Sequence, residues 1–314
     1  GSHLDTQPNG GRFDGVLGVL SALEVIRMLN EDSIKTVHPI EIVNFTNEEG
    51  ERFTPPMMGS GILTGNYDKW ETYSIQDRDG TTFEEALKKI EYLGSKKNRL
   101  RNPACFIEWQ VEQGPILEKE QKDIGIVEGV KGMTRFHVEL EGQSCHAAFP
   151  AVGRKDALVA ASEMVLAIDE AAGEYEHLST TVGVFEVSPS VINIVSGKVN
   201  FAFDVRHIDD GVRSQAIESI KGKLQQIAEK RELRCRIEQT WNINGTFFSE
   251  DLLDDIKSLA DKRGYSHHVV ASGAGHDAKF MNDITPSAMI FAPSWKGLSH
   301  CEEEFTSFEQ IEKC

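Results

Sequence analysis

The order of apolar segments along the chain constrains the fold more than any other feature of the sequence. After a strand at the very start, a buried helix is predicted over residues 15–29, where apolar residues recur at helical spacing. A short apolar strand is predicted over 39–45, a helix after the capping-box pattern of Thr82 and Glu85, and another strand over 106–111. This alternation is typical of an α/β fold with a mostly parallel sheet and flanking helices.

The middle of the chain follows a different pattern. Residues 135–140 and 199–205 alternate apolar and polar side chains, as strands with one exposed face do. With the helices and strands predicted around them, the order becomes β-α-β-β-α-β, which is the ferredoxin-like α+β pattern. The α/β pattern then resumes toward the C-terminus. We therefore expect one domain formed by residues 1–129 and 241–314, and a second domain inserted over 130–240.

Composition argues against some classes of partner. The 314 residues carry a formal net charge of −17, which argues against a nucleic acid held through its phosphates. The longest apolar runs are far shorter than the roughly 20 residues that a membrane-spanning helix requires, so no membrane partner is expected. The five cysteines form no Cys-x-x-Cys pair, so we expect reduced thiols and a cytoplasmic protein.

Candidate metal ligands stand at the ends of several apolar segments. They are His3, Asp14, the pair Glu48–Glu49 and His300. Imidazole and carboxylate are the ligands that a borderline cation such as Zn²⁺ takes. A second glutamate beside a ligand glutamate provides the base that metal-assisted hydrolysis needs. The set therefore suggests a hydrolytic metal site.

Each of these motifs also has a simpler explanation. Gly-Ser-His3 can be the remnant of an expression tag, Asp14 an ordinary helix N-cap, and the pair of glutamates a solvated turn. Asp5 lies two residues from His3 and shares a strand face with it, so its carboxylate is expected to accept the other ring N–H of His3. Together the motifs favour a metal site more strongly than any one of them alone.

Five strings occur in order along the chain: GSHLDTQPNGGRFDG, NFTNEEGERF, VEQGPILE, SGAGHDA and GLSHCEEE. Together they resemble the amidase, hydantoinase and carbamoylase branch of the M20 metallopeptidase family. The resemblance covers essentially the whole chain. It implies a zinc-exopeptidase-like catalytic domain, expected here to be truncated at both ends, with an inserted lid or dimerisation domain. It also implies two divalent metal ions (Zn²⁺, or Mn²⁺ or Co²⁺) and a homodimer formed through the lid.

The resemblance assigns the ligands of the two metals. One metal is held by Asp14, Glu49 and His300, with Asp14 bridging. The other is held by His3, Asp14 and a histidine that stands at the position of Gln110. This chain has the neutral amide of Gln110 there, and an amide oxygen is a poorer ligand for Zn²⁺ than imidazole. We therefore expect a weakened second metal site, with Gln110 a doubtful ligand.

The resemblance also assigns roles in the chemistry. Glu48 matches a general base that activates metal-bound water, and His146 matches a lid histidine that stabilises the oxyanion from across the dimer. Arg206 carries a guanidinium fork, which suits the carboxylate of a substrate. The positions expected to contact substrate are Gln113, Asn193, Arg206 and His276.

These features predict a metal-dependent amidohydrolase that cleaves linear C–N bonds of N-carbamoyl-L-amino acids or related ureido acids. An allantoate or ureidoglycolate amidohydrolase is the first alternative, and a dipeptidase or aminoacylase fits the strings less well. A catalytically weakened dimerisation or binding module is the alternative from a different class, because Gln110 replaces a metal-ligand histidine. The intact Glu48, Glu49 and His300 oppose that alternative.

Overall fold

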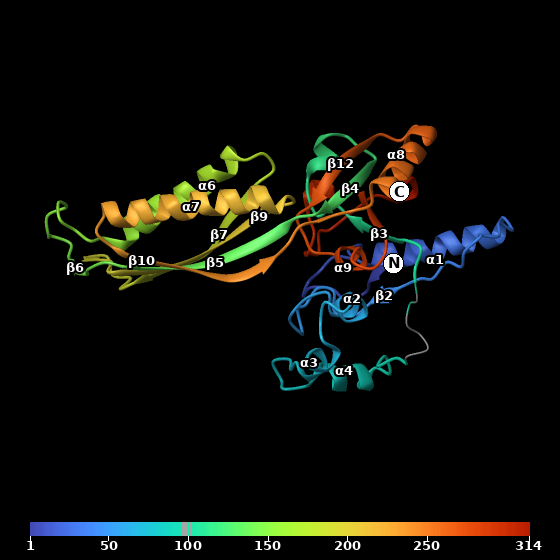
Figure 1. Cartoon of the computed structure of the whole chain (residues 1–314), viewed down its shortest axis with the longest axis horizontal. Coiled ribbons are helices and arrows are strands. Elements are labelled where there is room, and N and C mark those ends of the chain that lie inside the picture. The colour runs from blue at the N-terminus through green and yellow to red at the C-terminus, as the bar shows by residue number, and fades with distance from the viewer. Residues whose placement is uncertain (96–99, 101) are drawn as a thin grey trace. The chain divides into compact units, whose positions relative to one another are not determined.

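The chain divides into two units (Figure 1). The computed structural model describes residues 1–95, 100 and 102–314. Gly1–Val130 and Phe247–Cys314 form the first unit, and Lys131–Thr246 form the second. The second unit is thus inserted between two parts of the first. Each unit has its own buried core, and each is described by itself.

A mixed sheet forms the centre of the first unit. Its strands are β3 (Phe106–Val111), β4 (Ile124–Val130), β11 (Thr246–Phe247), β12 (His267–Ser272) and β13 (Ser287–Ala292). β12 runs parallel to β4 and β13 parallel to β3, but β13 runs antiparallel to β4. The prediction of a mostly parallel sheet therefore holds only in part. The chain turns back between β3 and β4 because their connection contains only the four-residue helix α5 (Ile116–Lys119) and no long crossover helix.

Two short parallel strands carry the N-terminal motifs. β1 (Ser2–His3) pairs with β2 (Asn44–Phe45), so the carboxyl ends of both strands lie at the same edge. β1 also contacts β3. The strand predicted over 39–45 is shorter than expected, because residues 39–43 adopt no regular secondary structure.

Several further helices belong to the first unit. They are α2 (Met58–Thr64), α3 (Lys69–Ser74), α4 (Phe83–Lys89), α8 (Glu250–Arg263), α9 (Asp277–Met281), the 3-10 turn η2 (Trp295–Gly297) and α10 (Phe308–Lys313). The predicted capping box at α4 is confirmed, because the Thr82 hydroxyl accepts the Glu85 N–H and the Glu85 carboxylate accepts the Thr82 N–H. α8 ends at Gly264, whose φ of 73° is a conformation that glycine adopts at low cost.

No helix in the described part of the chain is long and apolar enough to cross a membrane.

The first long helix, α1 (Val16–Glu31), confirms the predicted helix but not its predicted burial. Leu17, Gly18 and Val19 in its first turn are buried, and the helix packs on β1 and β3. Leu20 and Leu23 are 55% and 51% exposed. The spacing of apolar residues correctly predicts the helix. Whether its apolar face is buried depends on neighbouring elements, which the spacing does not specify.

An antiparallel sheet with two helices forms the second unit. Its elements are β5 (Gly132–Glu141), α6 (Ala157–Glu174), β7 (Ser179–Ser188), β9 (Lys198–His207), α7 (Asp210–Lys230) and β10 (Arg234–Ile243), with β6 (Cys145–His146) paired to β8 (Ile194–Val195). The sheet order is β10-β5-β9-β7. Leaving aside the short β6 and β8, the chain order is the β-α-β-β-α-β pattern. The role of this unit as a lid or a dimerisation surface stays a prediction.

Alternating side chains build the core of the second unit. Every second residue of β9 is buried, including Phe201, Phe203 and Val205. α6 and α7 both pack on this sheet and contribute to the same core cluster. The alternation that predicted these strands therefore reflects one covered and one more exposed face of the sheet.

Candidate metal centre

The predicted ligands lie in loops that follow strands. Asp14 lies two residues before α1, Glu48 and Glu49 follow β2, and His300 follows β13 and η2. Because β1 and β2 are parallel, the segments that follow them begin at the same edge. Asn47, which precedes the glutamate pair, and His300 both have a φ of 56°. Residues other than glycine adopt this left-handed conformation at a cost in free energy, and such residues cluster at functional sites.

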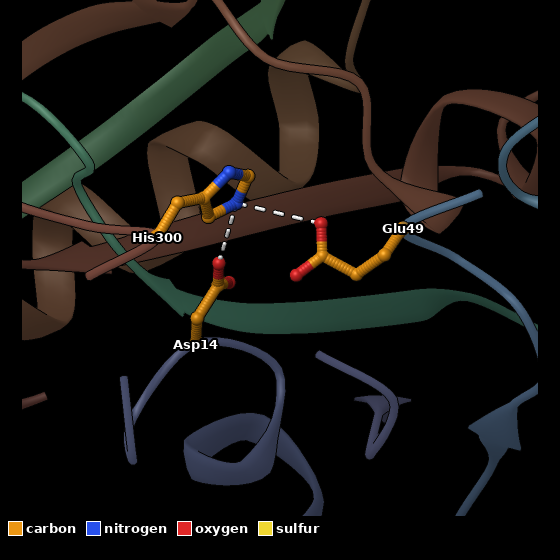
Figure 2. A group of neighbouring side chains, drawn as sticks. All are labelled: Asp14, Glu49 and His300. Carbon is orange, nitrogen blue, oxygen red and sulfur yellow. Dashed lines mark ion pairs between the residues drawn. The ribbon is translucent and has the colours of Figure 1, made fainter. Parts of the chain in front are cut away.

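Asp14, Glu49 and His300 point toward one another (Figure 2). The Nε2 atom of His300 lies 3.0 Å from Asp14 Oδ2 and 3.4 Å from Glu49 Oε2. One ligand atom from each side chain lies within 4.8 Å of the other two. Among the described residues, no other three His, Cys, Asp or Glu side chains are grouped this closely. One imidazole and two carboxylates are a donor set that Zn²⁺ and similar cations accept.

Burial and hydrogen bonding shift the pKa values of the three cluster residues. Burial acts to raise the pKa of Asp14, but the hydrogen bond from His300 and the other histidines nearby act to lower it, and the net shift of the pKa is downward. The same hydrogen bond raises the pKa of His300. Burial raises the pKa of Glu49, against the hydrogen bond that Gln7 Nε2 donates at 2.9 Å. The two carboxylates therefore stabilise a positive charge at the position of the His300 imidazole.

Two buried oxygen atoms of the cluster have no hydrogen-bond donor. They are Asp14 Oδ1 and Glu49 Oε1. A buried polar atom without a partner costs on the order of 1–3 kcal/mol. Asp14 Oδ1 lies 3.8 Å from His3 Nε2, whereas the oxygens that face His300 are Asp14 Oδ2 and Glu49 Oε2. A divalent cation bound by these carboxylates would supply a positive partner for buried groups that lack donors. The residues of the cluster therefore fit a metal ion.

Glu48 lies beside the cluster and is 6% exposed. Its Oε2 atom lies 3.5 Å from His3 Nε2. Burial raises the pKa of Glu48 well above its usual range, and the nearby carboxylates of Asp277 and Glu108 raise it further. The Glu48 carboxyl therefore holds its proton more strongly than an exposed glutamate does. A cation at the cluster would favour the ionised form, which can accept a proton.

Asp5 contacts His3 through a different atom from the one expected. His3 Nδ1 lies 2.9 Å from the backbone oxygen of Asp5 but 3.8 Å from its carboxylate. The carboxylate instead accepts the backbone N–H groups of Glu48 and Glu49, at 3.3 and 3.1 Å. His3 is 1% exposed, and its Nε2 atom lies 3.8 Å from Asp14 Oδ1. Asp5 therefore connects the histidine motif to the glutamate pair.

Gln110 and Gln113 both form hydrogen bonds next to the cluster. Gln110 lies fully buried in β3, where its Oε1 accepts the Gly15 N–H at 3.0 Å and its Nε2 lies 3.1 Å from His3 Nε2. Gln113 Nε2 donates to Asp14 Oδ2 at 2.7 Å. Gln113, which the resemblance assigns to substrate, thus directly contacts a candidate metal ligand.

His276 lies at the start of α9 and is 1% exposed. Its Nε2 atom lies 2.8 Å from Ser272 Oγ, and its Nδ1 atom has no hydrogen-bond partner. Burial lowers its pKa, so the ring is neutral near pH 7. The ring also meets Phe291 edge to face, with 5.8 Å between the ring centroids. A contact between His276 and substrate stays a prediction.

His146, Asn193 and Arg206 belong to the second unit, and their contribution to the metal centre stays a prediction. His146 is exposed on β6, which pairs with β8. Asn193 lies next to it, because its backbone oxygen accepts the Ala147 N–H at 2.9 Å. Arg206 Nε donates to Asp204 Oδ1 at 2.7 Å. His146 and Asn193 are therefore neighbours, whereas Arg206 lies near the other end of β9.

Sequence reasoning missed Glu304, which holds the Asp14 loop in place. Its Oε1 accepts the backbone N–H groups of Phe13 and Asp14, at 2.8 and 3.0 Å, and its Oε2 accepts the Ser299 hydroxyl at 2.6 Å. Glu304 is the last of three consecutive glutamates, and such a run resembles a solvated surface segment. Gln7, which donates to Glu49, carried no recognisable signal either.

The whole chain matches proteins of one family. The model for peptidase family M20/M25/M40 matches residues 1–314. The N-carbamoyl-L-amino-acid amidohydrolase of Rhizobium meliloti is 39% identical over 315 residues, which cover 98% of this chain and 75% of that protein. The allantoate amidohydrolase of Bacillus subtilis (strain 168) is 33% identical over 319 residues, which cover 99% of this chain and 77% of that protein.

A solved structure agrees with these matches. The crystal structure of an amidase of the hydantoinase/carbamoylase family from Burkholderia multivorans is similar with a TM-score of 0.97 and 39% sequence identity. The match covers 100% of this chain and 77% of that chain. The chain is therefore a hydrolase of the peptidase family M20/M25/M40, and it belongs to the amidase, hydantoinase/carbamoylase branch of that family.

Proposed function

We propose that this chain is a metal-dependent amidohydrolase that cleaves linear C–N bonds in N-carbamoyl-L-amino acids or related ureido acids. The observation that carries the proposal is the cluster of Asp14, Glu49 and His300 beside the buried Glu48. The names of the two relatives, which refer to N-carbamoyl amino acids and allantoate, support this substrate class. Zn²⁺, Mn²⁺ or Co²⁺ is the cation proposed for the cluster.

The chemistry follows from the positions of the carboxylates. A divalent cation bound at the cluster supplies Lewis acidity for the substrate carbonyl and lowers the pKa of a water molecule. Glu48 accepts a proton from the attacking water and later donates it to the leaving amine. Asp5 holds the backbone of Glu48 in place, and Gln113 orients Asp14. For an N-carbamoyl amino acid and one water, the products are the amino acid, ammonia and CO₂.

The second unit acts in this proposal as a lid that completes the site of a partner subunit. Lys198 and Arg206 are eight residues apart on β9, which corresponds to roughly 26 Å of strand. His146 lies beyond the Lys198 end, because β6 pairs with β8, the strand that precedes β9. A substrate of amino-acid size is too short to contact both His146 and Arg206 of one subunit. A homodimer, in which each site takes these residues from different subunits, removes the conflict.

An allantoate or ureidoglycolate amidohydrolase is the second candidate. It is favoured by the match to the allantoate amidohydrolase of Bacillus subtilis. Both substrate classes contain a ureido C–N bond and a carboxylate, so the same metal centre serves either of them. A catalytically silent binding module would require a decayed metal centre, and the grouped Asp14, Glu49 and His300 oppose it.

The proposal is tested by ammonia release from N-carbamoyl-L-amino acids, β-ureidopropionate and allantoate, with added Zn²⁺, Mn²⁺ or Co²⁺. We expect turnover on one of these substrates. Glu48→Gln, which removes the proton acceptor and keeps the shape, is expected to lower kcat by about 10²- to 10⁴-fold. Its metal content should be unchanged, because the cluster ligands remain.

Glu51→Gln is the matched control, because Glu51 is exposed and lies three residues further along the same loop. It should leave kcat near the wild-type value. A Glu48→Gln variant as active as wild type would exclude Glu48 as the base. No turnover on any substrate with any of the three metals would favour the silent module.

A further inference from the structure

Gln110 has the contacts of a structural amide rather than those of a metal ligand. Its Oε1 accepts the backbone N–H of Gly15 at 3.0 Å. Its Nε2 donates to Ser2 Oγ at 3.1 Å and lies 3.1 Å from His3 Nε2. Gln110 is 0% exposed, so these protein contacts surround its amide group on both sides. The residues present therefore do not fit a cation bound between His3 and Gln110.

The neighbours of Gln110 determine which way its amide faces. A backbone N–H can only donate, so the atom that faces Gly15 must be the oxygen. The Ser2 hydroxyl donates to Glu108 Oε1 at 2.7 Å, so Ser2 Oγ needs an N–H group from Gln110. Turning the amide over would leave the buried Gly15 N–H without an acceptor, which is unfavourable in a buried position. The nitrogen, and not the oxygen, therefore faces His3.

The ring nitrogens of His3 are both engaged. Nδ1 lies 2.9 Å from the backbone oxygen of Asp5, which can only accept, so Nδ1 donates its N–H there. Nε2 is then the acceptor, and the Gln110 amide N–H faces it at 3.1 Å. Gly15 packs against the same ring, since a Cβ atom at Gly15 would lie 2.4 Å from His3 Cε1. The lone pair that would bind a cation is thus used within the protein.

We infer that this chain holds a single cation, at Asp14, Glu49 and His300, and that the Gln110 amide takes the place of a second one. The inference rests on the cation position proposed above. His3 is then a positioning residue that lies beside Glu48, 3.5 Å from its carboxylate, and not a ligand.

The test is the number of metal ions per chain, measured by inductively coupled plasma mass spectrometry after loading with Zn²⁺ and desalting. We expect one ion in the wild-type chain. Gln110→His, which supplies an imidazole beside His3, should raise the number to two. Gln110→Met, a side chain of similar length that does not favour Zn²⁺, should leave it at one. His3→Gln should also leave it at one.

The outcomes separate this inference from the proposed function. Two ions in the wild-type chain, with one lost in His3→Gln, would overturn the inference and leave the proposed function standing. A Gln110→His chain that unfolds at the wild-type temperature but binds one ion would also overturn it. No ion in the wild-type chain, or one that survives in His300→Ala, would instead contradict the cation position on which the proposed function depends.

Discussion

A single buried side chain, Glu304, connects two loops that carry candidate ligands. Glu304 is 3% exposed, and its carboxylate accepts three hydrogen bonds, from the N–H groups of Phe13 and Asp14 and from the Ser299 hydroxyl. Ser299 directly precedes His300. Glu304 therefore positions both Asp14 and His300 without belonging to the cluster. Partners of metal ligands commonly affect metal affinity in this way.

Replacement of Glu304 by alanine should weaken metal binding. We expect Glu304→Ala to raise the Zn²⁺ dissociation constant by about 10- to 100-fold. The backbone N–H groups of Phe13 and Asp14 would lose their acceptor, and Asp14 would no longer be held in position. Competition with a chromophoric chelator measures this constant. Glu304→Gln keeps an oxygen for the backbone N–H groups and should have a smaller effect. Glu303→Ala, at an exposed neighbouring position, is the matched control. Wild-type affinity in a folded Glu304→Ala chain would refute the positioning role.

At the level of the element, α6 shows how one helix divides its residues between core and solvent. Ala160, Met164 and Ile168 are buried at a spacing of four residues, which places them on one face of the helix. Leu166 is 62% exposed on the other side. Asp156 caps the helix by accepting the N–H groups of residues 158 and 159, at 3.1 and 3.2 Å. The helix is therefore held by its cap and by one apolar face.

Truncations on the two faces of α6 should have different costs. Met164→Ala removes a fully buried side chain and should lower the free energy of unfolding by about 2–5 kcal/mol. Leu166→Ala, a truncation of similar size on the exposed face of the same helix, should change it by less than about 0.5 kcal/mol. Urea denaturation followed by circular dichroism measures both. Equal losses would mean that the exposed face of α6 is covered in the native protein.

At the level of the whole molecule, the two units carry different parts of the predicted site. The cluster and Glu48 lie in the first unit, and His146, Asn193 and Arg206 lie in the second. The length of β9 separates His146 from Arg206, so a complete site requires a second copy of the chain in the proposed mechanism. This arrangement leads to a prediction about mixtures of inactive variants.

Two variants that are inactive alone should restore activity when they are unfolded and refolded together. In a mixed dimer of Glu48→Gln and His146→Ala, one site has an intact first unit from one chain and an intact His146 from the other. Random pairing should give about a quarter of the wild-type activity. Ammonia release measures it, and analytical ultracentrifugation verifies the dimer.

A control mixture separates this explanation from simple reactivation. Glu48→Gln mixed with His300→Ala should stay inactive, because both changes lie in the first unit and no dimer then contains an intact one. If the mixture of Glu48→Gln and His146→Ala also stays inactive in a dimeric preparation, the site does not combine residues from two subunits.

The fold was predictable where the signal is local. The capping box of Thr82 and Glu85 and the strand over 106–111 were confirmed, because hydrogen bonding near a helix end and apolar alternation depend on adjacent residues. β4 escaped prediction because Gly125 and Gly129 weaken its strand signal. Gly125 is nevertheless suited to its place, since a Cβ atom there would lie 2.9 Å from Phe291 Cβ. Phe291 belongs to β13, which is far from β4 in the sequence, so the residues around Gly125 give no sign of this contact.

By itself, the sequence determined the kinds of ligand, the positions of the helix caps and the resemblance to the family, because these depend on residue type and order. Only the tertiary structure decided that Asp14, Glu49 and His300 converge on one point, and that the oxygen of Gln110 faces Gly15 and not His3. These features depend on contacts between segments far apart in the chain. A hydrogen-bond donor or acceptor acquires its role only when folding brings its partner within reach.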